Sequence, residues 1–486
     1  MKKLAPALSL TALLLGGCVS LDPAYQRPAA PVPQAWPTGP AYPAAAAADR
    51  TAAQIGWQDF FADPKLKTVI QQALTNNRDL RVAVDNVLAA RAEYGVERSA
   101  LFPTINAAAS AQYAREPLSV LGVTNPSASG YGNKDYVYER IYQAGLQTSN
   151  YELDLFGRVQ SLSRSAFDQY LATEEAQRAA QITLVSQTAS AWLTLGADSA
   201  LLKVAQDTAK SGGDYLDLTR HRFQAGVASQ LDVRQAETTV DTANADIARY
   251  TTAVAQDRNA LELLVGAPVA DDLLPDDVTD QVTVLAQLPA GLSSDVLLQR
   301  PDVAEAEDQL KSQNAQIGAA RAAFFPSITL TGQGGFTSTS LAQLFTGPSK
   351  AWSFTPTISL PIFAGGLNVA NLHHAQAERD VSVAQYEKAV QTAFREVSDA
   401  LAQRGTIDSQ INAEQALVDA ASDSLRLSQA SYERGALSYL DVINAQVTLY
   451  SARQGLIAAR LTRSTNVVTL YTALGGGLDA AKTATP

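Results

Sequence analysis

The residues of this chain that could do chemistry are few. It has one cysteine and three histidines, which are His221, His373 and His374. The last two are neighbours in a stretch that we expect to be helical, where adjacent side chains point to different faces and do not predict a shared metal site. No glycine-rich loop is followed by a lysine at the start of a helix, as phosphate binding would require. We therefore expect no catalytic site, no metal and no cofactor, and predict that the protein is not an enzyme.

One motif, Gly-x-x-Ser-x-Leu-Asp-Val, occurs twice and carries the most distinctive set of polar residues. Its members are Gly226, Ser229 and Asp232 in the first copy and Gly435, Ser438 and Asp441 in the second. A serine followed three residues later by an acid can cap the start of a helix, and the glycine before it can make the preceding turn. Helix capping explains the motif structurally, and it does not exclude a function for the two aspartates.

The motif is part of a duplication that extends over both halves of the chain. The turn Phe102-Pro103-Thr104-Ile105 recurs as Phe325-Pro326-Ser327-Ile328. At equal distances before these turns stand Asp79 and Arg98 in the first half and Asp302 and Arg321 in the second. A duplication of this length indicates two similar structural units, so the function must suit a pseudo-symmetric molecule.

The first residues have the features of a secretory signal, with Lys2 and Lys3 before an apolar run and small residues before a cleavage site. The only cysteine, Cys18, stands at that site in a pattern that resembles a bacterial lipobox, in which it becomes the lipidated first residue. The alternative is an ordinary signal peptide with an unrelated cysteine. Val19 follows, and a residue other than aspartate there resembles the sorting pattern for the outer membrane.

The chain is acidic, with a net charge of −11 that becomes about −13 when Lys2 and Lys3 leave with the signal. This balance argues against nucleic acid as a partner and against a basic membrane-binding surface. A single cysteine excludes an intrachain disulfide. No stretch after the signal is long and apolar enough for a transmembrane helix, so a membrane role would use the lipid, β-strands or both.

Proline divides the rest of the chain. Residues 23–43 contain seven prolines and are expected to be extended, whereas residues 127–267 and 362–485 contain none. Proline is strongly unfavourable inside helices, so the two proline-free stretches predict long helical hairpins. In both stretches apolar residues recur three and four positions apart, which is typical of coiled-coil packing.

Other segments alternate apolar and polar residues with a period of two. Trp352, Phe354 and Ile358 alternate with serine and threonine, and similar patterns begin at Ile105 and Ile328. Residues 136–155 are rich in tyrosine. The pattern predicts two strands in each half, either in a membrane or in the half-buried sheet of a soluble domain. Four strands cannot close a barrel, and an open edge is not viable in lipid. Membrane strands would need two chains for a filled eight-stranded barrel or three chains for a twelve-stranded barrel with a lumen.

These patterns divide the chain into six segments. They are a signal peptide at 1–17, an extended, lipid-anchored segment at 18–57, a first repeat at 58–267, a connector at 268–292, a second repeat at 293–475 and a flexible tail at 476–486. In the first repeat we expect strands near 103–118 and 136–156 and a helical hairpin at 157–267. In the second we expect a helix at 293–325, strands near 326–338 and 350–363 and a hairpin at 364–475.

Several motifs in the same order resemble the TolC/OprM outer-membrane efflux factors, and most of all the lipidated, NodT-like branch that serves RND multidrug pumps. Besides the lipobox, the Phe-Pro turns and the repeated motif, they are residues 25–33 (YQRPAAPVP), 153–158 (LDLFGR) and 360–366 (LPIFAGG). The resemblance covers nearly the whole mature chain. It implies a mainly α fold with a transmembrane β part, in which three chains form a twelve-stranded β-barrel, four strands from each, continued by a long periplasmic α-helical coiled-coil barrel.

The resemblance also implies partners and a function. The homotrimer would stand in the outer membrane, anchored by lipid, and meet a periplasmic adaptor protein that links it to an inner-membrane RND-type pump. It would conduct drugs or other small toxic compounds passively, since nothing in the chain could hydrolyse ATP or carry protons through a membrane. An export duct for protein or oligosaccharide is the alternative within transport. A coiled-coil structural lipoprotein of the envelope is the alternative outside it.

Candidate site residues follow from the resemblance, position by position. Turns between helix and strand are expected at Pro103, Gly157, Pro326, Pro361, Gly365 and Gly366. A periplasmic gate is expected at Asp232, Tyr432, Asp441 and Asn444, and contacts with the adaptor are expected at Arg222, Gly226, Val227, Arg434, Gly435 and Ala436. The chain departs from the TolC branch at Leu437, where an arginine makes a tight link, and at Asn444, where that branch has an acid. Rings of three aspartates would still favour cations.

Overall fold

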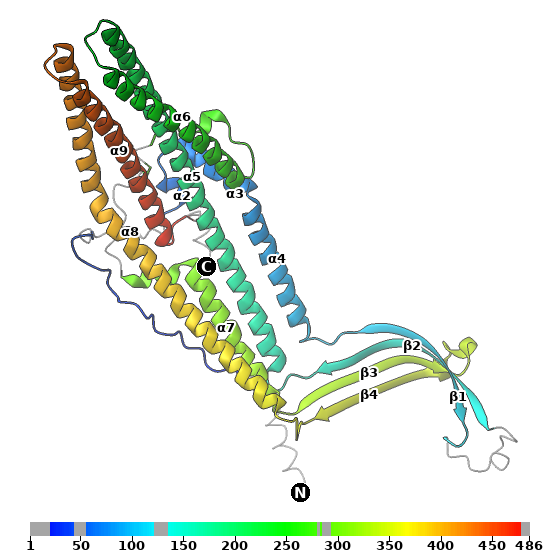
Figure 1. Cartoon of the computed structure of the whole chain (residues 1–486). Helices are drawn as coiled ribbons and strands as arrows, with labels where there is room; N and C mark the ends of the chain where they lie inside the picture. Colours follow the sequence, from blue (N-terminus) through cyan, green and yellow to red (C-terminus); the bar gives the residue numbers. More distant parts are fainter. Residues whose placement is uncertain (1–19, 43–54, 121–134, 279–281, 284–292, 478–486) are drawn as a thin grey trace. The chain divides into compact units, whose positions relative to one another are not determined.

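The computed structural model describes residues 20–42, 55–120, 135–278, 282–283 and 293–477. The chain forms two compact units, and its elements follow one another as labelled in Figure 1. The first unit contains residues 1–27, 89–170 and 308–383, and the second contains residues 28–88, 171–307 and 384–486. The signal peptide, Cys18 and nearly all of the C-terminal tail lie outside the described residues.

Most of the described residues are helical. The helices are α2 (Trp57–Phe60), α3 (Pro64–Asn76), α4 (Arg78–Ser99), α5 (Arg158–Gln224), α6 (Gln230–Val265), α7 (Pro301–Ala322), α8 (Leu367–Glu433) and α9 (Tyr439–Ala473). The strands are β1 (Asn106–Pro117), β2 (Tyr136–Glu152), β3 (Ser327–Ser338) and β4 (Lys350–Ser359). None of the helices among the described residues combines the length and the apolar character needed to cross a membrane.

The first unit contains one antiparallel sheet with the strand order β1-β2-β3-β4, so that β1 and β4 are its edges (Figure 1). The register of β2 against β3 shifts between Thr148 and Tyr151. Every residue of β4 is exposed, and Trp352 keeps 82% of its surface accessible. Since neighbouring residues of a strand point to opposite faces, β4 is uncovered on both faces in the single chain.

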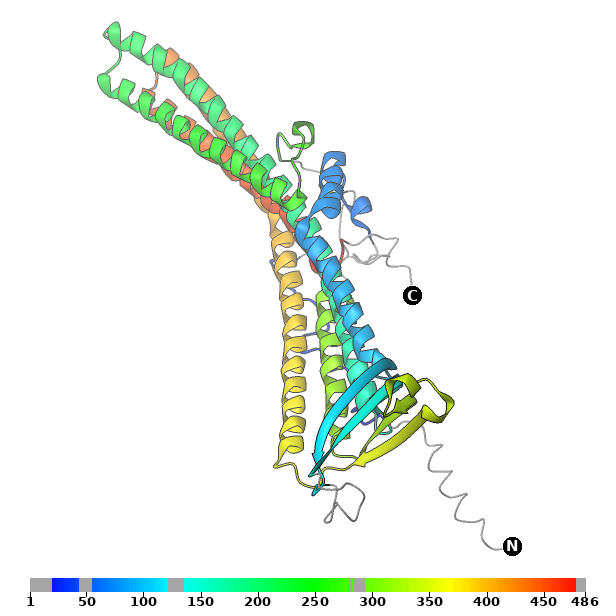
Figure 2. The ribbon, with the colours of Figure 1, turned by 90° about the vertical axis from the view of Figure 1, so that its right-hand side faces the viewer.

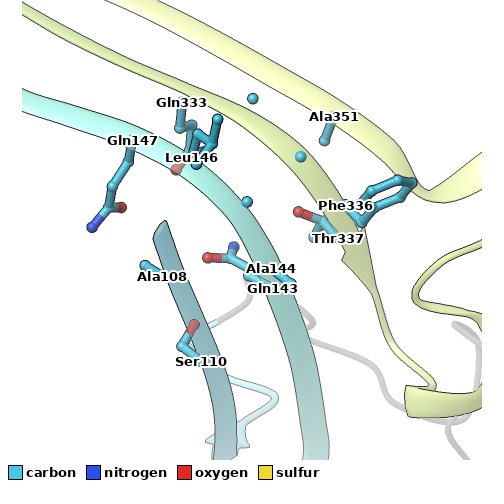
Figure 3. Close-up of a pocket in the computed structure, with 13 residues that line it drawn as sticks. Ala108, Ser110, Gln143, Ala144, Leu146, Gln147, Gln333, Phe336, Thr337 and Ala351 are labelled. Carbon is cyan, nitrogen blue, oxygen red and sulfur yellow. The ribbon is translucent and has the colours of Figure 1, made fainter. Parts of the chain in front are cut away.

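Glycines let β2 and β3 approach closely where Gly145 lies opposite Gly335. A Cβ at Gly145 would lie 2.6 Å from the carbonyl oxygen of Gly334, and a Cβ at Gly335 would overlap the carbonyl oxygen of Ala144. A Cβ at Gly334 would have no described atom within 4 Å. Figure 3 shows this part of the sheet, with Ala144 on β2 and its register partner Phe336 on β3. Glycine at such positions permits sharp bends and close approach of strands.

Two helical hairpins, α5–α6 and α8–α9, reflect the duplication (Figure 2). The first helix of each hairpin is 67 residues long, and the second has 36 residues in α6 and 35 in α9. In the second unit α6 packs against α9, so that each half of the chain contributes one helix to this contact. Within the proline-free stretches, residues 158–265 and 367–473 form the helical hairpins that the composition predicts, whereas β2 occupies part of the first stretch.

An aromatic cluster brings the start of the second unit together with its last helix. Phe60 of α2 stacks on Tyr471 of α9 with ring centroids 3.7 Å apart, and Phe61 meets the same tyrosine edge-on. All three side chains are fully buried. The Tyr471 hydroxyl donates a hydrogen bond to the carbonyl oxygen of Ile55, which satisfies its polar end inside the core.

A buried arginine connects three helices of the second unit. Arg300, which is 8% exposed, donates to both carboxylate oxygens of Asp302 at 2.9 and 2.7 Å and to Glu396 at 2.8 Å. Its remaining amino group donates to the carbonyl oxygen of Ala473 at 2.8 Å. The start of α7, the middle of α8 and the end of α9 are thus joined by one guanidinium whose planar fork suits several acceptors.

The contact between β2 and β3 makes a testable prediction about two adjacent glycines. Gly335→Ala should destabilise the sheet by about 1–3 kcal/mol, because its Cβ would force the two backbones apart. Gly334→Ala should be close to neutral, because its Cβ enters open space. The measurement is the thermal unfolding midpoint of the detergent-extracted protein by circular dichroism. Equal midpoints for the two variants would contradict the close approach.

Candidate functional site

The loops that join the two helical hairpins are built in the same way. Gly226 and Gly435 adopt left-handed backbone conformations, with φ of 75° and 77°. After α5 the N–H of Val227 donates to the carbonyl oxygen of Arg222 at 2.9 Å, and the N–H of Ala436 makes the equivalent bond after α8. This pattern satisfies the last carbonyl groups of a helix and needs glycine because other residues are strained there.

The aspartates of the repeated motif cap the helices that follow. The carboxylate of Asp232 accepts from the backbone N–H of Ser229 at 2.7 Å and from its hydroxyl at 2.8 Å, and Asp232 N–H donates to the serine hydroxyl at 3.1 Å. Asp441 accepts from the N–H and hydroxyl of Ser438 at 3.1 and 2.7 Å. The predicted capping role is confirmed, and both carboxylates are held at the starts of α6 and α9.

Tyr432 is buried between the two hairpins. Only 6% of its surface is exposed, the guanidinium of Arg222 lies 4.3 Å from its ring centroid, and the ring of Tyr439 lies 5.3 Å away. Burial raises the pKa of Tyr439 to about 12. The structure therefore brings a candidate gate residue of α8 against a candidate adaptor-contact residue of α5, within one chain.

The other candidate residues at this end of the hairpins are accessible. Asp232 is half-buried, and Asp441 and Asn444 are exposed on the first two turns of α9. The exposed candidates for adaptor contact are Gly226, Val227, Arg434, Gly435 and Ala436. Leu437 is also exposed, at 43%. These side chains and loops lie at the surface of the hairpin ends, where a second protein can reach them.

Hydrogen bonds farther from the loops join α6 to α9. The Tyr450 hydroxyl donates to the carboxylate of Asp246 at 2.6 Å, and Arg249 pairs with the other oxygen of Asp246 at 3.0 Å. Arg249 also donates to the Tyr250 hydroxyl at 2.7 Å. Sequence reasoning did not single out Asp246 or Arg249, since only the packing of α6 on α9 brings them to Tyr450.

A pair of acids lies in the first hairpin. Burial, followed by the neighbouring carboxyl of Asp198, raises the pKa of Asp257 to about 6. Its Oδ2 atom is buried without a hydrogen-bond donor among the described residues. Two adjacent carboxylates can form a hydrogen bond only when one of them carries a proton, which explains the direction of the shift.

Every candidate turn residue lies between a helix and a strand. Pro103 precedes β1, Pro326 precedes β3, Gly157 precedes α5, and Pro361, Gly365 and Gly366 separate β4 from α8. The three glycines have φ of 75°, 58° and 86°. Proline and left-handed glycine end one regular structure and redirect the chain into the next. The described residues contain no group of three or more histidine, cysteine, aspartate or glutamate side chains that could hold a metal ion.

A sheet with unpaired edges, joined by sharp turns to two long helical hairpins, fits the outer-membrane channel class that the sequence predicts. The chain belongs to the outer membrane efflux protein family, whose model matches residues 69–267 and 292–476. This finding confirms the predicted family, the mainly helical fold with four strands, and the outer-membrane location.

The relatives of this chain in Pseudomonas putida include the toluene efflux pump outer membrane protein TtgC and the antibiotic efflux pump outer membrane protein ArpC. Each is 46% identical over 98% of this chain and 96% of its own length. The crystal structure of the open state of the MtrE outer membrane channel of Neisseria gonorrhoeae is 37% identical. It covers 95% of this chain and 99% of its own, with a TM-score of 0.83.

The contact between Arg222 and Tyr432 predicts how the two hairpins respond to a mutation. Arg222→Ala should remove about 1 kcal/mol of attraction between the hairpins, because it uncovers the face of a buried aromatic ring. Amide hydrogen exchange at residues 430–442 should become faster. Arg434→Ala is the matched control, since that side chain is exposed. An equal change in both variants would argue against the contact.

The raised pKa of Asp257 predicts a dependence of stability on pH. Because the folded chain holds this proton more tightly than the unfolded chain, stability falls as the pH rises from about 4 to about 6. Asp257→Asn should raise the free energy of unfolding at pH 7.5 by about 1 kcal/mol, after discounting for solvent screening, and should have little effect at pH 4. Asp241→Asn, at an exposed acid of the same helix, is the control in denaturant titrations at both pH values.

Proposed function

We propose that this protein is the outer-membrane exit duct of a tripartite efflux system and conducts small toxic compounds passively to the outside. One observation carries this function. A single duplicated chain contains both an open four-stranded sheet and two capped helical hairpins. Membership of the outer membrane efflux protein family supports it. The partners are an adaptor protein in the periplasm and an RND-type pump in the inner membrane.

The open sheet edges require other copies of the chain. In lipid, unpaired backbone groups at β1 and β4 would each cost several kcal/mol, so the edges must pair between chains. Three chains give twelve strands, which leaves room for a lumen, whereas two would give a filled barrel. The exposed Trp352, Phe354 and Ile358 of β4 would face lipid, and the serines and threonines between them would face the lumen.

The cargo proposed for this duct is small organic molecules. The names of TtgC and ArpC refer to toluene and to antibiotics, which are small compounds, and the chain aligns with these proteins over nearly its full length. We propose no catalytic step, since the candidate residues act as caps, turns and contacts. The drive for transport must come from the pump.

The lipid attachment at Cys18, the gate and the adaptor surface are further parts of the proposal. The gate consists of Asp232, Tyr432, Asp441 and Asn444, with the two aspartates repeated around the trimer axis. Three copies of each acid would concentrate negative charge and favour cations at the narrow end. The adaptor would contact the exposed loop residues and Arg222.

A bilayer experiment can separate the charge of the aspartates from their capping role. Asp232→Asn combined with Asp441→Asn keeps an oxygen that can accept the capping bonds but removes the charge. The cation-to-anion permeability ratio should fall towards about one, as expected when fixed charges leave a pore. Measurement is by single-channel recording of the purified protein in asymmetric salt.

Ser229→Ala combined with Ser438→Ala is the control for this experiment. It weakens the caps by about 1 kcal/mol each and leaves the carboxylates charged. Its ion preference should equal that of the wild type. An unchanged ratio in the asparagine variant would remove the aspartates from the proposed gate, and a failure of all three proteins to conduct would contradict the channel itself.

A further inference from the structure

The described N-terminal segment contacts one face of α7. Four residues of α7, spaced three or four positions apart and therefore on one stripe of the helix, meet successive residues of the segment. They are Lys311 near Tyr25, Asn314 with Pro23, Gly318 with Asp22 and Arg321 with Leu21. The segment thus runs in the opposite direction to α7, and all these residues belong to the first unit.

Asp22 is the charged residue of the segment that this contact encloses. Its side chain is 8% exposed, although it lies in an extended segment near the start of the described chain. One carboxylate oxygen accepts from the hydroxyl of the buried Ser161 at 2.5 Å, and the other accepts from Arg164 of α5 at 2.9 Å. Breaking these two bonds would leave the carboxylate buried without partners, which costs free energy. The bonds therefore hold Asp22 in this position.

The carboxylate fits into a notch that exists only because residue 318 is glycine. A Cβ at Gly318 would overlap the Oδ1 atom of Asp22 and would lie 2.8 Å from the hydroxyl oxygen of Ser161. The duplication provides a comparison, because Gly95 of α4 stands at the equivalent distance before the first Phe-Pro turn. A Cβ at Gly95 would have no described atom within 4 Å, so the first copy of this notch holds no side chain of the described chain.

The carbonyl groups on both sides of Asp22 are also bound. Arg321 donates to the carbonyl oxygen of Leu21 at 3.1 Å, and Asn314 donates to that of Pro23 at 2.7 Å. Asn314 is 9% exposed. Three consecutive residues of the segment are therefore fixed by side chains of α5 and α7, and this degree of recognition exceeds what an incidental surface contact would require.

We call the contact of Asp22 with Ser161, Arg164 and Gly318 the Asp22 lock. The lock lies at the ends of α5 and α7 that adjoin the sheet. Ser161 is in the first turn of α5, which follows β2, and Gly318 is in the last turns of α7, which precedes β3. If the strands cross the outer membrane, these helix ends lie at its periplasmic surface. Cys18 precedes Asp22 by four residues, so its Cα can lie at most about 14 Å from that of Asp22.

We propose that Asp22 is the positioning residue of the mature N-terminal segment. By entering the notch at Gly318 it fixes the segment to α5 and α7, and it thereby holds the attachment point at Cys18 close to the membrane surface from which the strands rise. The consequence for the lipid rests on the proposed acylation of Cys18, whereas the docking of residues 21–25 does not. The acyl chains would then enter the inner leaflet beside the sheet of the same chain.

The test is limited proteolysis of residues 20–42 in the full-length, detergent-extracted protein, with proteinase K and intact-mass detection. Asp22→Ala should increase the rate of cleavage in this segment about tenfold or more, the factor expected from loss of a charge-assisted hydrogen bond. Gly318→Ala should do the same, because it expels the carboxylate. Gly95→Ala, the matched glycine of the first repeat, should cleave at the wild-type rate.

A double variant makes the test specific to the notch. Gly318→Ala should have little further effect once Asp22 is alanine, because the clashing carboxylate is gone and the Ser161 hydroxyl, 2.8 Å from the added Cβ, can turn away. The lock would be overturned if the two substitutions increased the cleavage rate additively, or if Asp22→Ala were cleaved at the wild-type rate. If Asp22→Ala does not assemble, Asp22→Asn serves in its place, since it keeps the side-chain size and loses the pairing with Arg164. The mass of the mature protein tests acylation separately, so an unacylated Cys18 would overturn the lipid anchor and leave the docking result standing.

Discussion

The constraint on which the rest of the structure depends is the unpaired edge of a four-stranded sheet. β1 and β4 each present backbone donors and acceptors on one side, and β4 is uncovered on both faces. In water, the apolar side chains of such a sheet would be exposed. In lipid, the backbone groups at its edges would lack hydrogen-bond partners. Association of identical chains satisfies both requirements, since it pairs β1 of one chain with β4 of the next. Each half of the chain contributes two strands and one hairpin. A trimer therefore contains six similar units, arranged with quasi-sixfold symmetry.

Because of the same duplication, one sequence motif forms the loop of both hairpins. Glycine in the left-handed conformation closes the first helix, and serine with aspartate opens the second. Asp232 and Asp441 consequently serve stability and, in the proposed channel, electrostatics. Substitution by alanine removes both contributions together. Variants that keep one and remove the other are therefore needed to assign a function to these residues.

Much of the fold follows from local patterns in the sequence. The absence of proline predicts the hairpins, the alternation at residues 352–360 predicts a strand near 350–363 where β4 is found, and the spacing of Ser229 and Asp232 predicts the cap. Contacts between distant residues could not be predicted in this way. Tyr432 beneath Arg222, Asp246 beside Tyr450, and the Arg300 hub arise only when separate helices pack. From the sequence, Gly318 is only an unfavourable residue inside a helix, and its role becomes visible when Asp22 occupies the space beside it.

Native mass spectrometry of the detergent-extracted protein tests the central claim most directly, because it counts the chains that close the sheet. We expect a single species with the mass of three chains, which corresponds to twelve strands around a lumen. A stable species with the mass of one chain would mean that the sheet edges do not require partners. A species of two chains would give eight strands and a filled barrel, and it would contradict the proposed duct.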